Sequence, residues 1–281
     1  MRIHLCGVRG SSPAAGVDFV RYGGNTSCVA LAHDGASAPT LVLDAGTGIQ
    51  RASALLGEAP FTGTVLLTHM HWDHILGLPF FGAAEDDDWR VSVLLPEQES
   101  GRDAESVFEV VMSPPYYPIA PRQLSGEWTF ASIVPGELRI EGFEVLVREI
   151  PHKGGRTFGY RISDGRSAIA YMPDHCPTTF GMGEDDFGAY HPAAMELAQG
   201  VDVLVHDAQL FPAEFPQQAY FGHALADYAP ALAGRAGARS AMLFHHAPER
   251  TDDALDVLAD RLGGGSSPEV IVASEGTTIE L

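Results

Sequence analysis

The 281-residue sequence predicts an α+β protein in which two packed β-sheets carry helices on their outer faces. Segments with the hydrophobic pattern of strands occur in both halves of the chain. Segments typical of helices are confined to 49–56, 102–112 and the region after residue 191. No internal repeat or low-complexity tract divides the chain, so we expect residues 1–281 to form a single domain.

In the first half, the pattern predicts strands at 2–8, 26–33, 41–44, 64–67 and 90–95 and helices at 49–56 and 102–112. The proline-rich segment 113–121 excludes regular structure. We expect it to be an ordered loop. Its tyrosines either cover the mouth of a site or simply pack beneath the loop.

In the second half, segments 128–134, 138–150, 157–163 and 167–172 alternate in the manner of an antiparallel meander. Asp164-Gly165 is typical of a hairpin turn. From residue 191 onward, helices and strands alternate, with helices at 191–199, 223–236 and 251–262 and strands at 201–206, 240–244, 269–273 and 277–280.

Composition excludes several classes of protein. The net charge of −20 and the single lysine, Lys153, argue against a general binder of polyanions, which are gripped by Lys and Arg. No apolar run is long enough for a membrane span, and the N-terminus lacks a signal-peptide pattern. The three widely spaced cysteines indicate no disulfide framework. These features favour a cytoplasmic protein without membrane contact.

The chemistry is concentrated in segment 68–74, which contains His69, His71, Asp73 and His74 directly after the strand predicted at 64–67. Imidazole and carboxylate are the usual ligands of zinc and similar ions. In an extended loop, alternate side chains share a face, so His69, His71 and Asp73 are expected to converge and His74 to point elsewhere. That arrangement suits two neighbouring metal ions better than one.

Other residues of ligand type stand at the ends of distant predicted strands. These are His152, which follows the strand ending at residue 150, Asp174, which follows 167–172, and His245, which follows 240–244. His246 is an alternative to His245. Asp44, at the end of strand 41–44, is placed to support the histidine-rich loop.

In ligand type and order, His69-x-His71-x-Asp73-His74, His152, Asp174 and His245 resemble the metallo-β-lactamase fold superfamily. The resemblance covers nearly the whole chain and implies a four-layer αβ/βα sandwich with a metal pair at the sheet edge. It implies that His69, His71 and His152 hold one metal, that Asp73, His74 and His245 hold the other, and that Asp174 bridges them. Aspartate at the bridging position resembles the phosphodiesterase, ribonuclease Z and glyoxalase branches, not the β-lactamases, which typically carry cysteine.

A finer resemblance involves Val205-His206-Asp207-Ala208-Gln209 and Gly222-His223-Ala224-Leu225-Ala226, which are similar to two motifs of the ribonuclease Z-like branch. The resemblance implies that His223 protonates the leaving group, that Asp207 orients His223, and that Asp73 belongs to the catalytic group. Asp207 replaces the glutamate of that branch, which puts the reach of the pair in doubt. The alternative interpretation is that His223 lies at the start of a helix and has no catalytic role.

The sequence therefore predicts a dinuclear metal-dependent hydrolase that acts on small phosphodiesters, such as cyclic nucleotides, through a hydroxide bridging two divalent ions. Zinc is the expected metal, and manganese or iron also suit the donor set. The alternatives are a tRNA 3′-processing ribonuclease, a lactonase or thioesterase, and a metal-binding sensor without catalysis. The expected partner is a small-molecule ester. Nucleic acid is not favoured, and similar proteins are commonly homodimers.

Overall fold

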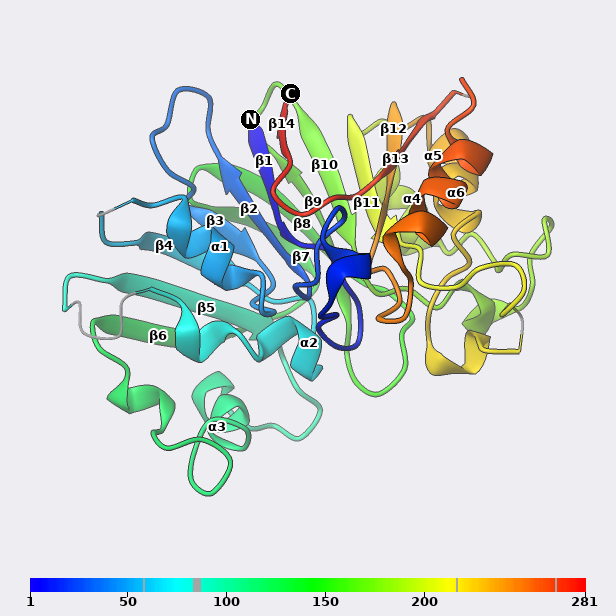
Figure 1. Cartoon of the computed structure of the whole chain (residues 1–281). Coiled ribbons are helices and arrows are strands. Elements are labelled where there is room, and N and C mark those ends of the chain that lie inside the picture. The colour runs from blue at the N-terminus through cyan, green and yellow to red at the C-terminus, as the bar shows by residue number, and fades with distance from the viewer. Residues whose placement is uncertain (58, 83–86, 216, 266) are drawn as a thin grey trace.

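Two seven-stranded sheets pack face to face in the computed structural model of the chain, which describes residues 1–57, 59–82, 87–215, 217–265 and 267–281 (Figure 1). In spatial order, the first sheet contains β14 (Thr278–Glu280), β1 (Arg2–Gly7), β2 (Cys28–Ala32), β3 (Leu41–Leu43), β4 (Thr62–Leu66), β5 (Arg90–Pro96) and β6 (Glu127–Ile133). The second contains β13 (Glu269–Val272), β12 (Ser240–Phe244), β11 (Val203–Asp207), β10 (Ala168–Met172), β9 (Phe158–Ser163), β8 (Phe143–Glu149) and β7 (Gly136–Ile140).

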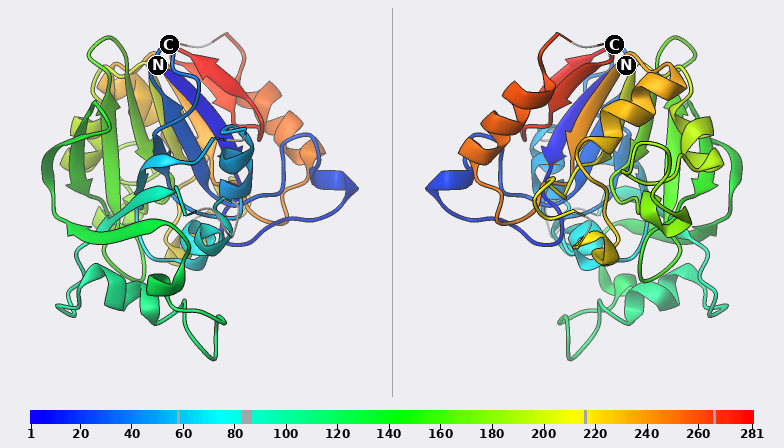
Figure 2. Two further views of the ribbon diagram at one scale, coloured as in Figure 1. Left: turned by 90° about the vertical axis from the view of Figure 1, so that its left-hand side faces the viewer. Right: turned by 90° about the vertical axis from the view of Figure 1, so that its right-hand side faces the viewer.

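Each sheet is antiparallel in one half and parallel in the other. Strands β14, β1, β2 and β3 pair antiparallel, and β3 through β6 pair parallel. In the second sheet, β7 through β10 pair antiparallel, and β10 through β13 pair parallel. The pairing of β1 with β14 brings the two termini together, as Figures 1 and 2 show.

The main core lies between the sheets, where alternating strand residues such as Ile3, Leu31, Val145 and Ile162 are fully or almost fully buried. Helix α1 (Ile49–Ala54) covers the outer face of the first sheet. Helices α4 (Pro192–Ala198), α5 (Tyr228–Ala236) and α6 (Asp252–Leu262) cover the second (Figure 2). The predicted α+β arrangement of two sheets between helices is thus confirmed.

The structure corrects two predicted boundaries and one predicted strand pairing. The strand predicted at 138–150 is two strands, because Glu141 and Gly142 have positive φ values of 49° and 84° and form a turn. Strand β6, predicted as part of the meander, instead pairs parallel with β5 in the other sheet. The helix predicted at 223–236 begins only at Tyr228, so His223 lies in the preceding loop, outside any helix.

The topology places many strand ends at one edge. Strands β3 and β4 run in the same direction in the first sheet, and β8, β10, β11 and β12 do so in the second. The loops that follow these strands carry the residues singled out from the sequence. Figure 1 shows the short helix α2 (Trp72–Ile75) between the lower ends of the two sheets. Helix α3 (Ala104–Glu109) lies in the segment between β5 and β6.

No helix among the described residues is long and apolar enough to span a membrane.

Candidate metal centre

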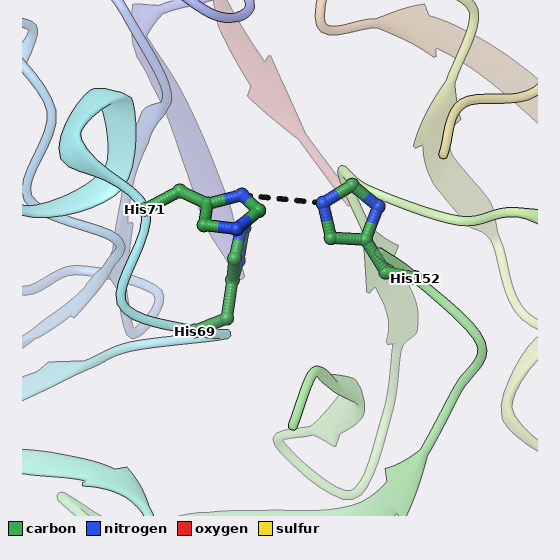
Figure 3. Close-up of side chains that lie close together, drawn as sticks. All are labelled: His69, His71 and His152. Atoms are coloured by element: carbon green, nitrogen blue, oxygen red, sulfur yellow. Dashed lines mark hydrogen bonds between the residues drawn. The ribbon is translucent and has the colours of Figure 1, made fainter. Parts of the chain in front are cut away.

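Three imidazoles from two distant loops meet at this edge. His69 and His71 follow β4, and His152 follows β8. One nitrogen of each ring lies within 4.8 Å of the corresponding atoms of the other two. His71 Nδ1 and His152 Nε2 are 3.3 Å apart, and Figure 3 shows the two rings facing each other with His69 beside them. This geometry gives three neutral nitrogen donors for one cation.

A second group contains Asp73, His74 and His245. His74 Nε2 lies 3.3 Å from His245 Nε2 and 3.3 Å from Asp73 Oδ2. His245 Nε2 lies 3.0 Å from the same carboxylate oxygen. His74 and His245 are fully buried, and Asp73 is nearly so. Two nitrogen donors and one oxygen donor therefore converge beside the first group.

Asp174, in the loop after β10, lies between the two groups. Its Oδ2 is 2.9 Å from His74 Nε2 and 3.3 Å from His245 Nε2. Its Oδ1 is 3.6 Å from His152 Nε2 and 4.0 Å from His69 Nε2. Each carboxylate oxygen thus faces a different group, which is the geometry that a bridging ligand requires.

Hydrogen bonds behind the rings fix which nitrogen faces the centre. His152 Nδ1 is 2.7 Å from the Gly222 carbonyl oxygen, so Nδ1 carries the proton and donates. His74 Nδ1 donates in the same way to Asp44 Oδ2 at 2.8 Å. In both rings Nε2 is then the nitrogen that faces the centre, and it is the atom that would bind a metal ion once unprotonated. The expectation that Asp44 supports the histidine loop fits these contacts.

The donors that converge here fit a cation. His69 Nε2 is buried and has no hydrogen-bond partner among the described residues, which is costly for a polar atom unless another group satisfies it. Although burial lowers the pKa of His74, the carboxylates of Asp174, Asp73 and Asp44 raise it well above its ordinary value. The same excess of negative potential attracts a divalent ion.

His223 and Asp207 form a hydrogen-bonded pair against this centre. His223 Nδ1 is 2.9 Å from Asp207 Oδ2, so the aspartate reaches the ring despite being shorter than glutamate. The backbone N–H groups of His175 and Gln209 donate to Asp207 at 3.1 and 3.0 Å and hold its carboxylate. The His223 ring stacks on His245 with centroids 5.1 Å apart. Burial lowers the pKa of His223, but Asp207 outweighs it and the pKa is raised.

Of the two adjacent histidines after β12, only His245 faces the centre. His246 Nε2 is 2.9 Å from the Ala273 carbonyl oxygen, and burial lowers the pKa of His246 to about 3. His245 has a φ of 59°, which is uncommon outside glycine and turns its side chain inward. A Cβ at Gly10 would lie 2.3 Å from His245 Nδ1, so the ring needs a glycine at that position.

The loop after β4 is not extended throughout, and this corrects one step of the sequence argument. His71 is the extended N-cap of α2, and Asp73 and His74 lie on its single turn. His71 therefore faces His69 and His152, whereas Asp73 groups with His74. The predicted convergence of His69, His71 and Asp73 on one face was wrong because a helical turn replaces the alternation of a strand.

Two contacts of the centre were missed from the sequence. The backbone N–H of Ser11 donates to Asp73 Oδ2 at 2.7 Å, and Ser11 has a left-handed φ of 61°. The Tyr171 hydroxyl donates to Asp44 Oδ2 at 2.9 Å. Both donors are ordinary residues whose roles depend on tertiary contacts, and the polar loop after β1 was the available signal for Ser11.

The proline-rich loop 113–121 lies beside α2. Tyr116 and Tyr117 line a largely apolar cavity of about 550 Å³ together with Trp72 and Phe80. The Tyr117 ring packs edge-on against Phe80, with centroids 6.1 Å apart, whereas Tyr116 is mostly exposed. The contact of Tyr117 with Phe80 fits simple packing beneath the loop. Among the described residues no metal ligand lines this cavity, so the expectation that the loop covers the mouth of the site stays a prediction.

Comparisons with known proteins agree with this fold. The profile of the family described as "Beta-lactamase superfamily domain" matches residues 40–246. A ribonuclease Z of Natronomonas pharaonis is 23% identical, and the match covers 92% of each chain. The crystal structure of the metallo-beta-lactamase fold protein YhfI from Bacillus subtilis aligns with a TM-score of 0.68, 18% identity and 99% coverage of each chain. A diphosphatase of the PhnP family aligns with a TM-score of 0.65 and 18% identity, covering 100% of this chain and 97% of that one.

Proposed function

This chain belongs to the β-lactamase superfamily domain family and is a metal-dependent hydrolase, and from that premise we propose that it hydrolyses small phosphodiesters. Cyclic nucleotides are the first compounds to test. The single observation that carries the proposal is the His223–Asp207 pair beside the metal centre, because it supplies a positioned proton donor for an alkoxide leaving group. The similarity to a ribonuclease Z and to a diphosphatase supports the choice of a phosphate ester.

In this proposal, His69, His71 and His152 would hold one divalent ion, and Asp73, His74 and His245 would hold a second. Asp174, whose two oxygens face the two groups, would be a ligand shared by both ions. Zinc suits the mixed nitrogen and oxygen donors best, and manganese or iron are the alternatives. When bound, the ions supply Lewis acidity that activates water and neutralises charge on the phosphoryl oxygens.

The protein's own groups perform the proton transfer. Asp207 holds His223 through Nδ1, which leaves Nε2 of His223 as the atom that delivers a proton. The raised pKa of His223 keeps the ring protonated over a wider pH range than a free imidazole. Asp44 and the Gly222 carbonyl hold His74 and His152 in the tautomer that binds a metal. This division of roles separates metal binding from proton donation.

A tRNA 3′-processing ribonuclease is the second candidate, because the match to the ribonuclease Z of Natronomonas pharaonis extends over 92% of both chains. The net charge of −20 and the single lysine oppose it, since a tRNA is bound largely through phosphate contacts to Lys and Arg. We therefore favour a small substrate.

The test is a substrate panel with purified protein loaded with zinc or manganese. It contains bis(p-nitrophenyl) phosphate, cyclic nucleotides, a precursor tRNA, and a lactone and a thioester as carbonyl substrates. Metal-dependent turnover of the small phosphodiesters supports the proposal if Asp174→Asn abolishes it for all of them and His223→Ala abolishes it for the cyclic nucleotides. Efficient cleavage of the precursor tRNA with weak small-molecule turnover selects the second candidate. Turnover of carbonyl esters alone contradicts both.

A further inference from the structure

A cavity of about 370 Å³ opens beside the metal centre and shares His152 with it. Three segments form its wall: residues 152–153 after β8, residues 176–179 after β10, and residues 219–222 before His223. We call this cavity the Lys153 pocket, after the one lysine of the sequence. None of the roles assigned above to the metal ligands or to the His223–Asp207 pair uses it.

Close backbone contacts hold the wall of the pocket in place. The Gly222 carbonyl oxygen accepts a hydrogen bond from His152 Nδ1 at 2.7 Å. A Cβ added at Gly222 would lie 2.8 Å from Lys153 Cβ, so only glycine allows the 219–222 turn to pack this closely against the aliphatic part of the lysine side chain. Cys176 Sγ lies 3.7 Å from the Ala219 carbonyl oxygen and joins the other two segments. The lysine side chain therefore starts from a fixed point next to a metal ligand.

The pocket is electrostatically unusual for so acidic a chain. Lys153 is exposed, its Nζ lies 5.3 Å from the centroid of the Tyr220 ring, and it forms no ion pair with a carboxylate among the described residues. Within the described part of the chain, no carboxylate lines the Lys153 pocket. By contrast, three other cavities in the described part of the chain that are lined by arginine are each lined by at least two carboxylates as well.

The donors of the pocket suit an anion. The Lys153 ammonium offers up to three N–H donors, and the hydroxyls of Thr178 and Thr179 offer two more. Hydrogen bonds between charged groups are shorter and stronger than those between neutral groups. A phosphate or carboxylate placed here would lie close to His152, and so within the span of one small substrate bound at the metal centre.

We propose that the Lys153 pocket binds a second anionic group of the substrate, so that the preferred substrates are phosphodiesters carrying an additional phosphate or carboxylate. This inference rests on the proposed function, because it concerns the selectivity of the same site. The second group contacts the ammonium and the threonine hydroxyls while the scissile phosphate lies at the metals. Lys153 acts as a specificity residue and takes no part in bond cleavage.

The test compares two chromogenic substrates that differ by one phosphate, the p-nitrophenyl ester of thymidine 5′-phosphate with and without a 3′-phosphate. The readout is the ratio of their kcat/KM values, in which any effect common to both substrates cancels. We expect the wild type to favour the 3′-phosphorylated substrate by about tenfold or more. Lys153→Met should bring the ratio close to one, and Lys153→Arg should keep part of the preference.

Arg166→Met is the matched control, because it removes one positive charge from the exposed β9–β10 turn at the opposite end of β10. It should keep the wild-type ratio. A wild type without preference, or a preference that Lys153→Met leaves intact, overturns the inference. If neither substrate is hydrolysed, the proposed function fails. The pocket is then judged by equilibrium binding of thymidine 3′,5′-bisphosphate and thymidine 5′-monophosphate to the metal-loaded wild type and Lys153→Met, where equal affinities overturn it.

Discussion

Asp44 Oδ2 lies 2.8 Å from His74 Nδ1, and both side chains are fully buried. The same carboxylate accepts hydrogen bonds from the backbone N–H of Thr68 at 2.7 Å and from the Tyr171 hydroxyl at 2.9 Å. Asp44 also has a φ of 57°, an uncommon conformation for a residue with a Cβ, which aims its side chain at the histidine loop. Through these hydrogen bonds, Asp44 connects the loop after β4 to the end of β3.

We expect Asp44→Asn to weaken metal binding about 10- to 100-fold, the usual effect of removing a carboxylate behind a metal-binding histidine. The physical reason is that an amide no longer stabilises the Nδ1–H tautomer of His74. Metal affinity measured by competition with a chromogenic chelator checks this. Tyr171→Phe is the control, since it removes only one of the donors to Asp44 and should have a smaller effect. Unchanged affinity in Asp44→Asn would show that the tautomer is fixed by other means.

Removal of metal should destabilise the protein, because the ligands join loops that follow four different strands. At a thousandfold excess of free metal over Kd, binding contributes about 4 kcal/mol, or roughly 10 °C in Tm for a chain of this size. Melting curves with added zinc and with a chelator measure the difference. Asp174→Asn should lose most of this response, because Asp174 lies within 4.0 Å of ring nitrogens in both groups. An identical Tm with and without metal would contradict the assigned ligand set.

His223→Ala should lower kcat most for substrates whose leaving group must be protonated as it departs. On a phosphodiester with a nucleoside leaving group, we expect a decrease of about 10²- to 10⁴-fold. On bis(p-nitrophenyl) phosphate the decrease should be much smaller, because p-nitrophenolate departs without protonation. Asp207→Asn should give an intermediate loss, and metal content should stay at the wild-type level in both variants. Equal losses on the two substrates would exclude a role in protonating the leaving group.

Local patterns in the sequence were sufficient to place most strands and most of the candidate site. Pro151 and Pro173 mark the strand ends before His152 and Asp174, and parallel strands bring such ends to one edge. The partition of donors between the two groups could not be predicted from periodicity. It depends on α2, a helix of four residues that is too short to leave a pattern and that places His71 and Asp73 in different groups.

Long-range contacts explain the other differences. Strand β6 has the alternation expected of a meander strand. Its pairing with β5 is made by backbone hydrogen bonds, and the pattern of side chains does not show which neighbouring strand supplies them. The N–H donation from Ser11 to Asp73 joins residues 62 positions apart through the backbone, so residue type gave no sign of it.

Stability should depend on pH through Asp164, in the hairpin turn. Burial raises the pKa of Asp164, but hydrogen bonds from the backbone of Ser167 and Arg166 and the Met1 amine, 3.1 Å away, outweigh it and lower the pKa to about 2. Since the pKa in the folded state lies below the ordinary value of 3.8, the ionised carboxylate stabilises the fold above that value. The contribution is lost as the pH falls toward 2.

Urea unfolding of the wild type and Asp164→Asn between pH 7 and pH 3 checks this dependence. The variant should be less stable at pH 7, and the difference should shrink as the pH falls below 4. Asp18→Asn, which removes the charge of an exposed carboxylate, is the control. A difference that grows toward acid pH would have the wrong sign for a lowered pKa.

Arg9 holds the loops behind His245 together and is fully buried. Its Nε donates to the Gly23 carbonyl oxygen at 2.7 Å, its Nη1 donates to the Arg250 carbonyl oxygen at 2.6 Å, and its Nη2 lies 3.8 Å from Asp252 Oδ1. Arg9→Met leaves these carbonyls without their donors and removes one of the two arginines that lie 3.8 Å from the buried Asp252 carboxylate, the other being Arg21. We expect it to lower the free energy of unfolding by about 3–5 kcal/mol.

Arg139→Met provides the comparison, because Arg139 pairs with Glu144 at 3.1 Å on the exposed surface, where an ion pair contributes about 1 kcal/mol or less. Arg9→Lys tests whether charge alone is sufficient. A lysine keeps the charge but cannot direct donors at two carbonyls and a carboxylate at once, so most of the loss should remain. Denaturant unfolding of the three variants at fixed metal concentration separates these cases. A wild-type midpoint for Arg9→Lys would show that the charge, and not the shape of the guanidinium group, stabilises the loops.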